Sequence, residues 1–298
     1  MMSKIVIGTW PLSGDFGKIS ATKCQDVLEY CYELGIKEFD TAPNYGNGFI
    51  ENQLGVVFKK KEDVLINTKM GNFPFKKKSY QVKELTKSFA ESLKKLQRDS
   101  INILFLHNPR DEIEDYAEVL DFMHELKDKN KINEIGLSKA RNFNYEEYVN
   151  LEEFDVIQDD INLLSLDVLK KPKPKGTVLM ARSPLASGLL ANRITEKTIF
   201  PPDDQRSAWL YGERLKSLMR RIREIKKISN LELSSLAIQF LLNQSSIDKI
   251  IFGIKSREHI KSITSEINEK LLDESISQSL IKLYDNDFGL KNEIEFAY

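Results

Sequence analysis

The feature that most constrains the fold of this chain is an alternation of short apolar runs with longer amphipathic segments. Most of the short runs precede a stretch in which apolar residues recur every three or four positions, as in Ser20–Leu34, Tyr80–Leu96 and Glu112–Lys129. Strands that alternate with helices predict a parallel sheet, and eight strands can close a barrel. We therefore expect a (β/α)8 TIM barrel that forms a single domain over residues 1–298, with strands in eight runs: Ile5–Gly8, Ile36–Phe39, Val64–Thr68, Ile101–Leu106, Glu134–Leu137, Val156–Gln158, Thr177–Met180 and Lys249–Phe252.

An open, doubly wound sheet is the main alternative to the barrel. Such sheets usually carry the nucleotide-binding pattern G-x-G-x-x-G after their first strand. Here the first strand leads into Gly8-Thr9-Trp10-Pro11, which lacks the pattern. No Gly/Ser-rich linker divides the chain, and the run from Lys170 to Lys175 is interpreted as a solvated connection between the sixth and seventh strands.

The charge balance and the cysteines limit the binding partners, the cellular location and the kinds of site that we expect for this protein. Lys and Arg number 44 and Asp and Glu number 45, so we expect neither a nucleic-acid partner nor a membrane surface. No stretch approaches the roughly 20 apolar residues of a membrane span. Cys24 and Cys31 lie seven positions apart on a predicted helix, about 10 Å at 1.5 Å per residue, too far for a disulfide. Free thiols favour a cytoplasmic location, and three histidines with two unclustered cysteines give no metal site.

Polar residues end three consecutive predicted strands. Asp40 follows the second strand, Lys69 the third and His107 the fourth, while Tyr45 lies in the loop after the second. Each has an ordinary alternative as a turn former, surface charge or packing residue. The carboxyl ends of barrel strands share one mouth, however, where active sites of such barrels lie. The sequence therefore predicts that the four side chains form one catalytic site.

This set of side chains suits proton donation to a carbonyl group. Tyrosine ordinarily has a pKa near 10, and a neighbouring Lys69 ammonium is expected to lower the pKa of Tyr45. Asp40 would keep a buried Lys69 charged, and a neutral His107 could orient the carbonyl oxygen. No residue supplies a hydride, which implies a redox cofactor.

The same residues resemble the aldo-keto reductase family. The resemblance extends from Gly8 to about Gly253 and covers the family's Asp, Tyr, Lys and His tetrad in order. It is carried by Asp40-Thr41-Ala42-x-x-Tyr45-Gly46 with Glu51 and Leu54-Gly55, by Lys69, by His107-Asn108-Pro109, by Ile135-Gly136-Leu137-Ser138, by Gln158 with Asn162-Leu163-Leu164, by Ser183-Pro184-Leu185-Ala186-x-Gly188-Leu189-Leu190 and by Phe200 to Arg206.

The resemblance implies NADP(H) bound across the barrel mouth. It assigns the nicotinamide carboxamide to Ser138 and Gln158, and the phosphates to Gly253, Lys255, Ser256 and Arg257 at a helix N-terminus, which favours anions. The basic residues of that loop, with His259, favour the 2′-phosphate of NADPH; an ordinary solvated helix start is the alternative. Further cofactor contacts are implied for Arg182, Ser183, Leu185, Asp204 and Arg206.

Three places depart from the family pattern, and one of them is Ser262-Ile263, where the family often has Glu-Asn near the adenine. Lys139 follows Ser138 where the family usually has Asn, and Arg182 precedes Ser183-Pro184-Leu185 where it usually has an aromatic residue on the nicotinamide. The planar guanidinium of Arg182 could stack on the cofactor or reach an anionic group of the substrate. Both roles are open from the sequence.

The expected activity is reduction of a small-molecule aldehyde or ketone, sugar-derived or simple, by NADPH, with Tyr45 as proton donor and a monomer favoured. Two other classes are open. One is a regulatory protein that keeps the fold and cofactor site but has little turnover. The other is an unrelated barrel lyase or isomerase without a nicotinamide.

Overall fold

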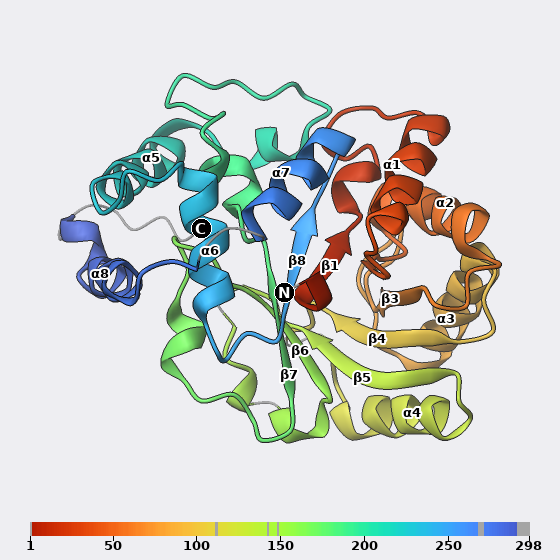
Figure 1. Ribbon diagram of the computed structural model, residues 1–298. Coiled ribbons are helices and arrows are strands. Elements are labelled where there is room, and N and C mark those ends of the chain that lie inside the picture. Colours follow the sequence, from red (N-terminus) through yellow and green to blue (C-terminus); the bar gives the residue numbers. More distant parts are fainter. Residues whose placement is uncertain (1, 111–112, 142, 148, 268–270, 291–298) are drawn as a thin grey trace.

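The computed structural model describes residues 2–110, 113–141, 143–147, 149–267 and 271–290, and its strands close into a parallel barrel (Figure 1). The strands follow chain order around the barrel, and β1 pairs with β8 to complete it. This confirms the predicted (β/α)8 fold, and no strand boundary differs from its predicted run by more than two residues. The strands are β1 Ile5–Gly8, β2 Glu38–Asp40, β3 Leu65–Met70, β4 Ile101–His107, β5 Ile132–Ser138, β6 Val156–Asp160, β7 Val178–Arg182 and β8 Lys249–Gly253.

Helices surround the barrel, and each predicted helix forms. Helix α1 begins after Ser20, whose side chain accepts a hydrogen bond from the Lys23 amide at 3.2 Å. Helix α4 begins at Tyr116, later than the predicted Glu112, because Asp115 caps it by accepting from the Glu118 amide; Glu112 itself lies outside the described residues. The helices are α1 Ala21–Glu33, α2 Phe49–Phe58, α3 Val82–Leu96, α4 Tyr116–Asp128, α5 Gly212–Lys226, α6 Leu233–Asn243, α7 Arg257–Ile267 and α8 Glu274–Asp285.

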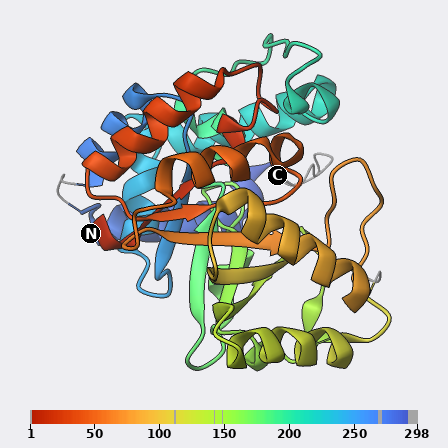
Figure 2. The same cartoon turned by 90° about the vertical axis from the view of Figure 1, so that its right-hand side faces the viewer.

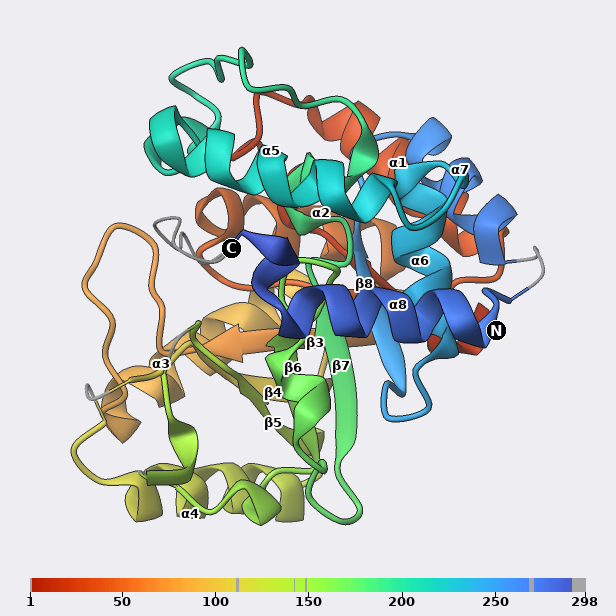
Figure 3. The ribbon, with the colours of Figure 1, turned by 90° about the vertical axis from the view of Figure 1, so that its left-hand side faces the viewer.

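The helices do not cover the outside of the barrel evenly. Helices α7, α1, α2, α3 and α4 pack side by side around one part of the barrel (Figure 2), and α8 packs against α5 on another (Figure 3). The described residues that follow β5 and those that follow β6 form only short 3-10 turns in place of helices. The lysine-rich segment lies between β6 and β7, as predicted. Cys24 and Cys31 are free and buried, as expected, and none of the described helices is long and apolar enough to cross a membrane.

The barrel interior is apolar in the middle and polar at the mouth. Side chains two positions apart on a strand point the same way. The interior layer of Val6, Ile103, Phe105, Val156, Met180 and Ile251 is therefore followed, toward the carboxyl ends, by polar side chains. Thus Phe105 is followed by His107, Val156 by Gln158 and Met180 by Arg182, so these three side chains meet at the mouth.

Candidate active site

A buried ion pair joins the ends of β2 and β3. Lys69 Nζ donates to Asp40 Oδ1 at 2.6 Å and to the Thr41 carbonyl at 2.8 Å. The Lys69 and Asp40 side chains are 1% and 5% exposed, so each is the other's main charge partner. Removing either one would leave an uncompensated buried charge.

Tyr45 lies directly beside this pair. Its ring stacks on Trp10 with centroids 5.7 Å apart, stands edge-on to His107 at 6.0 Å, and has Lys69 Nζ 5.2 Å from its centroid. The following residue, Gly46, has a φ of 54°, and a Cβ there would lie 2.4 Å from the Ser13 carbonyl oxygen. The turn that carries Tyr45 therefore requires glycine. The structure brings together all four residues of the predicted site.

The electrostatics of Tyr45 differ from the sequence expectation. Burial and the Asp40 carboxylate raise the pKa of Tyr45, and Arg182 is the cation that opposes them most. The expectation of a lowered pKa for Tyr45 was therefore wrong, because burial and the Asp40 carboxylate outweigh the nearby cations. Burial in turn lowers the pKa of Lys69, although Asp40 raises it.

His107 is held in its neutral form. Burial, followed by the charges of Lys69, Arg182 and Lys78, lowers the pKa of His107 well below its usual value. Its Nδ1 atom is buried and has no hydrogen-bond partner among the described residues. A neutral imidazole carries one donor and one acceptor nitrogen, so His107 has capacity to bind a substrate oxygen.

A chain of hydrogen bonds connects the Lys69–Asp40 ion pair with the predicted nicotinamide residues. Gln158 Nε2 donates to Asp40 Oδ2 at 2.9 Å, and Ser138 Oγ donates to Gln158 Oε1 at 3.0 Å. Both side chains are almost fully buried. The two residues predicted for the carboxamide are thus positioned by the same carboxylate that pairs with Lys69.

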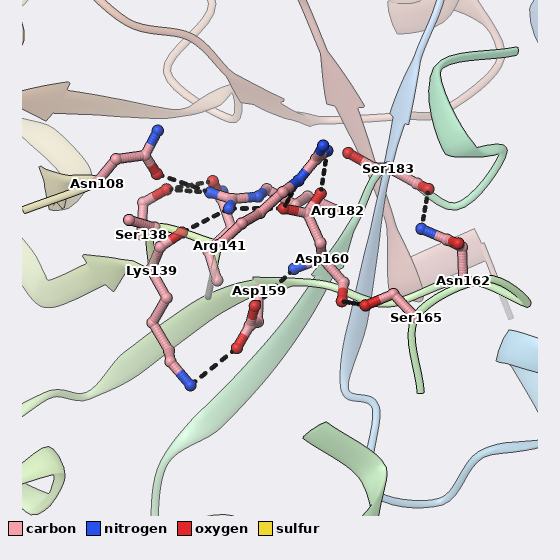
Figure 4. Close-up of polar contacts among 12 residues, drawn as sticks. Asn108, Ser138, Lys139, Arg141, Asp159, Asp160, Asn162, Ser165, Arg182 and Ser183 are labelled. Atoms are coloured by element: carbon pink, nitrogen blue, oxygen red, sulfur yellow. Dashed lines mark hydrogen bonds and ion pairs between the residues drawn. The ribbon is translucent and has the colours of Figure 1, made fainter. Parts of the chain in front are cut away.

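Arg182 extends this chain to the far side of the mouth (Figure 4). Its NH1 donates to Ser138 Oγ at 2.7 Å and to Asn108 Oδ1 at 3.1 Å. Its NH2 donates to the Lys139 carbonyl at 2.5 Å and to Asp160 Oδ2 at 2.8 Å. The guanidinium is therefore held by acceptors from the ends of β4, β5 and β6.

Three residues of this network were not predicted from the sequence. Asp160 lies two positions after Gln158 on β6, so strand alternation was a signal that could have found it. Arg141 pairs with Asp160 through Nε at 2.8 Å, but it lies in a loop after β5, where no periodicity marks it. The role of Asn108, with a φ of 51° after β4, likewise depends on loop geometry.

Lys139, another of the departures from the family pattern, turns away from the mouth. Its ammonium pairs with Asp159 at 2.9 Å and lies 5.7 Å from the centroid of the Tyr145 ring. Asp159 alternates with Gln158 and Asp160, so it points to the outside of the barrel. Only the main chain of Lys139 contributes to the site.

The loops after β1 and β7 meet above the barrel. Arg206 pairs with Asp204 at 2.6 Å and donates to the Ser187 carbonyl at 3.1 Å. Asp204 forms a β-bridge with Phe16, and Lys255 donates to the Phe16 carbonyl. Three predicted cofactor residues, Asp204, Arg206 and Lys255, therefore gather around one loop, where two cations face one carboxylate.

The other predicted phosphate residues lie at the start of α7 after Gly253. Ser256 Oγ accepts from the His259 amide at 3.4 Å, and the first-turn amides of a helix suit a phosphate in general. Arg257 instead pairs with Asp26 of α1, with Nε 2.9 Å from Oδ2, and the His259 ring contacts Arg193 at 3.2 Å.

The remaining predicted residues are Ser183 and Leu185 after β7. Ser183 has a φ of 55°, and its carbonyl accepts from Asn162 Nδ2 at 3.1 Å. Leu185 is partly buried and directly precedes the 3-10 turn Ala186–Ala191. In the part of the chain that the structure describes, no cluster of three or more His, Cys, Asp or Glu could hold a metal ion.

Comparisons with known proteins agree with this architecture. Residues 4–281 match the model of the Aldo/keto reductase family. The chain is 25% identical to the NADH-specific methylglyoxal reductase of Escherichia coli, covering 91% of this chain and 92% of that one. It is 28% identical to the L-galactose dehydrogenase of Arabidopsis thaliana, covering 90% and 85%. A glycerol dehydrogenase from Gluconobacter oxydans shares the fold with a TM-score of 0.79 at 21% identity, over 99% of this chain and 94% of that one.

Proposed function

This chain belongs to the aldo/keto reductase family, and we propose that it reduces an aldehyde or ketone to an alcohol with NADPH, with Tyr45 as the proton donor. The observation that carries the proposal is the grouping of Tyr45, Lys69 and His107 at one mouth, with Asp40 paired to Lys69. His107 also lies at that mouth beside Tyr45, and a neutral imidazole can donate a hydrogen bond to a carbonyl oxygen.

Each side chain has a distinct role in the proposed reaction. Bound NADPH supplies the hydride. His107, neutral because of burial and nearby cations, orients the carbonyl oxygen by donating a hydrogen bond. Tyr45 then gives its hydroxyl proton to that oxygen. Lys69 has two of its three N–H groups committed, to Asp40 and Thr41, and its charge stabilises the tyrosinate left behind.

The residues at the mouth fit a nicotinamide cofactor. Ser138 and Gln158 present a hydroxyl and a carboxamide that can pair with the amide of the ring, and Asp40 holds Gln158 in place. Lys255 and Arg206, with the amides at the start of α7, provide the positive charge that phosphates need. We expect NADPH to bind better than NADH, because the Lys255 ammonium lies next to Ser256 at this helix start, where it can act on the extra phosphate.

The substrate we propose is a small carbonyl compound. Relatives named as a methylglyoxal reductase and an L-galactose dehydrogenase span a small aldehyde and a sugar, and both classes belong in the first screen. The buried ion pair and neutral histidine favour catalysis over a purely sensing role, since a sensor has no need of a positioned proton donor.

The test is nucleotide binding followed by turnover on a carbonyl panel. Fluorescence titration with NADPH and NADH gives the two affinities, and each carbonyl is then added in turn while oxidation of the nucleotide is followed. Tight NADPH binding with turnover supports the proposal. Failure to bind either nucleotide would overturn it, and binding without turnover on any aldehyde, ketone or sugar would favour a sensing role.

A further inference from the structure

Two guanidinium groups share a single carboxylate at the mouth. Asp160 Oδ2 accepts from Arg182 NH2 and from Arg141 Nε, each at 2.8 Å, and Asp160 Oδ1 accepts from Arg141 NH2 at 3.1 Å. Although burial raises the pKa of Asp160, Arg182 and Arg141 hold it well below the usual range. The carboxylate is therefore ionised, and the cluster of Arg182, Asp160 and Arg141 carries two positive charges against one negative charge.

The net positive charge of this cluster reaches the catalytic groups. Arg182 NH1 lies 2.7 Å from Ser138 Oγ, which in turn donates to Gln158. The charge of Arg182 lowers the pKa of Tyr45, of Lys69 and of His107, whereas Asp160 raises the pKa of Tyr45 by a smaller amount. Any ring that binds beside Ser138 and Tyr45 experiences the same field.

The Arg182 side chain cannot easily turn toward another ligand. Its two terminal nitrogens carry four N–H groups, and these have four acceptors in Asn108, Ser138, Lys139 and Asp160. If these N–H groups bound a substrate anion, the hydrogen bonds that connect Arg182 to the ends of the neighbouring strands would break. What Arg182 retains for a ligand is its charge and the faces of its planar group.

We propose that the Arg182, Asp160 and Arg141 cluster makes this site bind the neutral reduced nicotinamide ring more tightly than the cationic oxidised ring. This inference rests on the function proposed above. The oxidised ring carries a positive charge that the reduced ring lacks, so the cluster repels only the oxidised form. One unit charge at about 6 Å, with an effective dielectric constant of about 40 between protein and water, corresponds to about a tenfold difference in affinity. Reduced nucleotide would then bind preferentially, and oxidised nucleotide would leave readily after each turnover.

The proposal is tested by the ratio of dissociation constants for NADP⁺ and NADPH. Both constants are measured by titration for the wild type and for charge variants at this cluster, at low ionic strength. Arg182→Gln removes a positive charge, so the ratio should fall about tenfold. Arg182→Lys keeps the charge and should retain most of the ratio. Asp160→Asn removes the negative charge and should raise the ratio, which is a change in the opposite direction.

The opposite signs separate a charge effect from simple damage to the site. Arg141→Gln provides a second variant that removes one positive charge. The Arg141 side chain is 33% exposed, so replacing it disturbs the fold less than replacing Arg182. If Arg182→Gln and Arg141→Gln fold but keep the ratio within twofold of wild type, or if the ratio falls in Asp160→Asn, the inference is overturned. The proposed function would not be affected by either result. A wild type that binds neither nucleotide would overturn the proposed function as well.

Discussion

Gln158 Nε2 donates a hydrogen bond to Asp40 Oδ2 at 2.9 Å, joining the end of β6 to the end of β2. The two residues are 118 positions apart in the sequence. Through this bond the residues assigned to the nicotinamide and the Lys69 ion pair share one carboxylate. The orientation of Asp40 is therefore fixed from two sides.

Replacing Tyr45 with Phe should remove turnover and leave nucleotide binding intact. The phenyl ring keeps its contact with Trp10, whereas the proton that the carbonyl oxygen needs is lost. Loss of a general acid lowers kcat by about 100- to 10,000-fold. The measurement is single-turnover kinetics beside a fluorescence titration of NADPH. A matching loss of NADPH affinity would show instead that Tyr45 contributes mainly to binding.

Replacing Lys69 with Met should destabilise the protein as well as inactivate it. The change leaves the Asp40 carboxylate buried without its ion-pair partner, which costs about 3–5 kcal/mol in the free energy of unfolding. The double change Lys69→Met with Asp40→Asn removes both charges and should recover much of that stability without recovering turnover. Urea unfolding of the single and double variants measures this, and equal stability of the two would contradict it.

Acid should destabilise the protein through His107. Its pKa is lowered in the folded state, so between that pKa and the ordinary value near 6.5 the unfolded chain binds a proton that the folded protein does not. This contribution to stability is fully present above about pH 6.5 and is lost as the pH falls, by up to about 1.4 kcal/mol per pH unit.

The control for the acid effect is His107→Gln, which cannot titrate in this range. Its free energy of unfolding should fall less steeply than that of the wild type between about pH 6.5 and the lower folded pKa. Denaturant titrations at a series of pH values give both curves. Parallel curves would mean that His107 does not titrate differently on unfolding.

Replacing Lys255 with Met should weaken NADPH binding more than NADH binding. Lys255 lies beside the start of α7, and its charge would act most strongly on the extra phosphate of NADPH. A single charge-assisted contact corresponds to about a tenfold change in affinity. Parallel titrations with the two nucleotides measure it. An equal loss for both would place Lys255 on a phosphate that they share.

Much of the fold could be predicted because its signals are local. A strand of a parallel barrel is a short apolar run, and that property depends only on neighbouring residues. All eight strands, and the shared position of Asp40, Lys69 and His107 at their ends, could therefore be predicted from the sequence. Cys24 and Cys31 are free because helical geometry alone holds their Cα atoms apart. The family resemblance added roles to these positions without changing where they lie.

Only the closed barrel decided which charges pair between segments that are far apart in the sequence. The sequence left Arg182 with two roles, and its acceptors come from the ends of three other strands, a choice that depends on the curvature and register of the barrel. In the same way, closure of the barrel places Arg257 beside Asp26 of α1, and it places Lys139 beside Asp159 on the outside of the barrel. Periodicity along a chain determines which face a side chain takes, whereas a partner far away in the sequence is determined by how the strands come together.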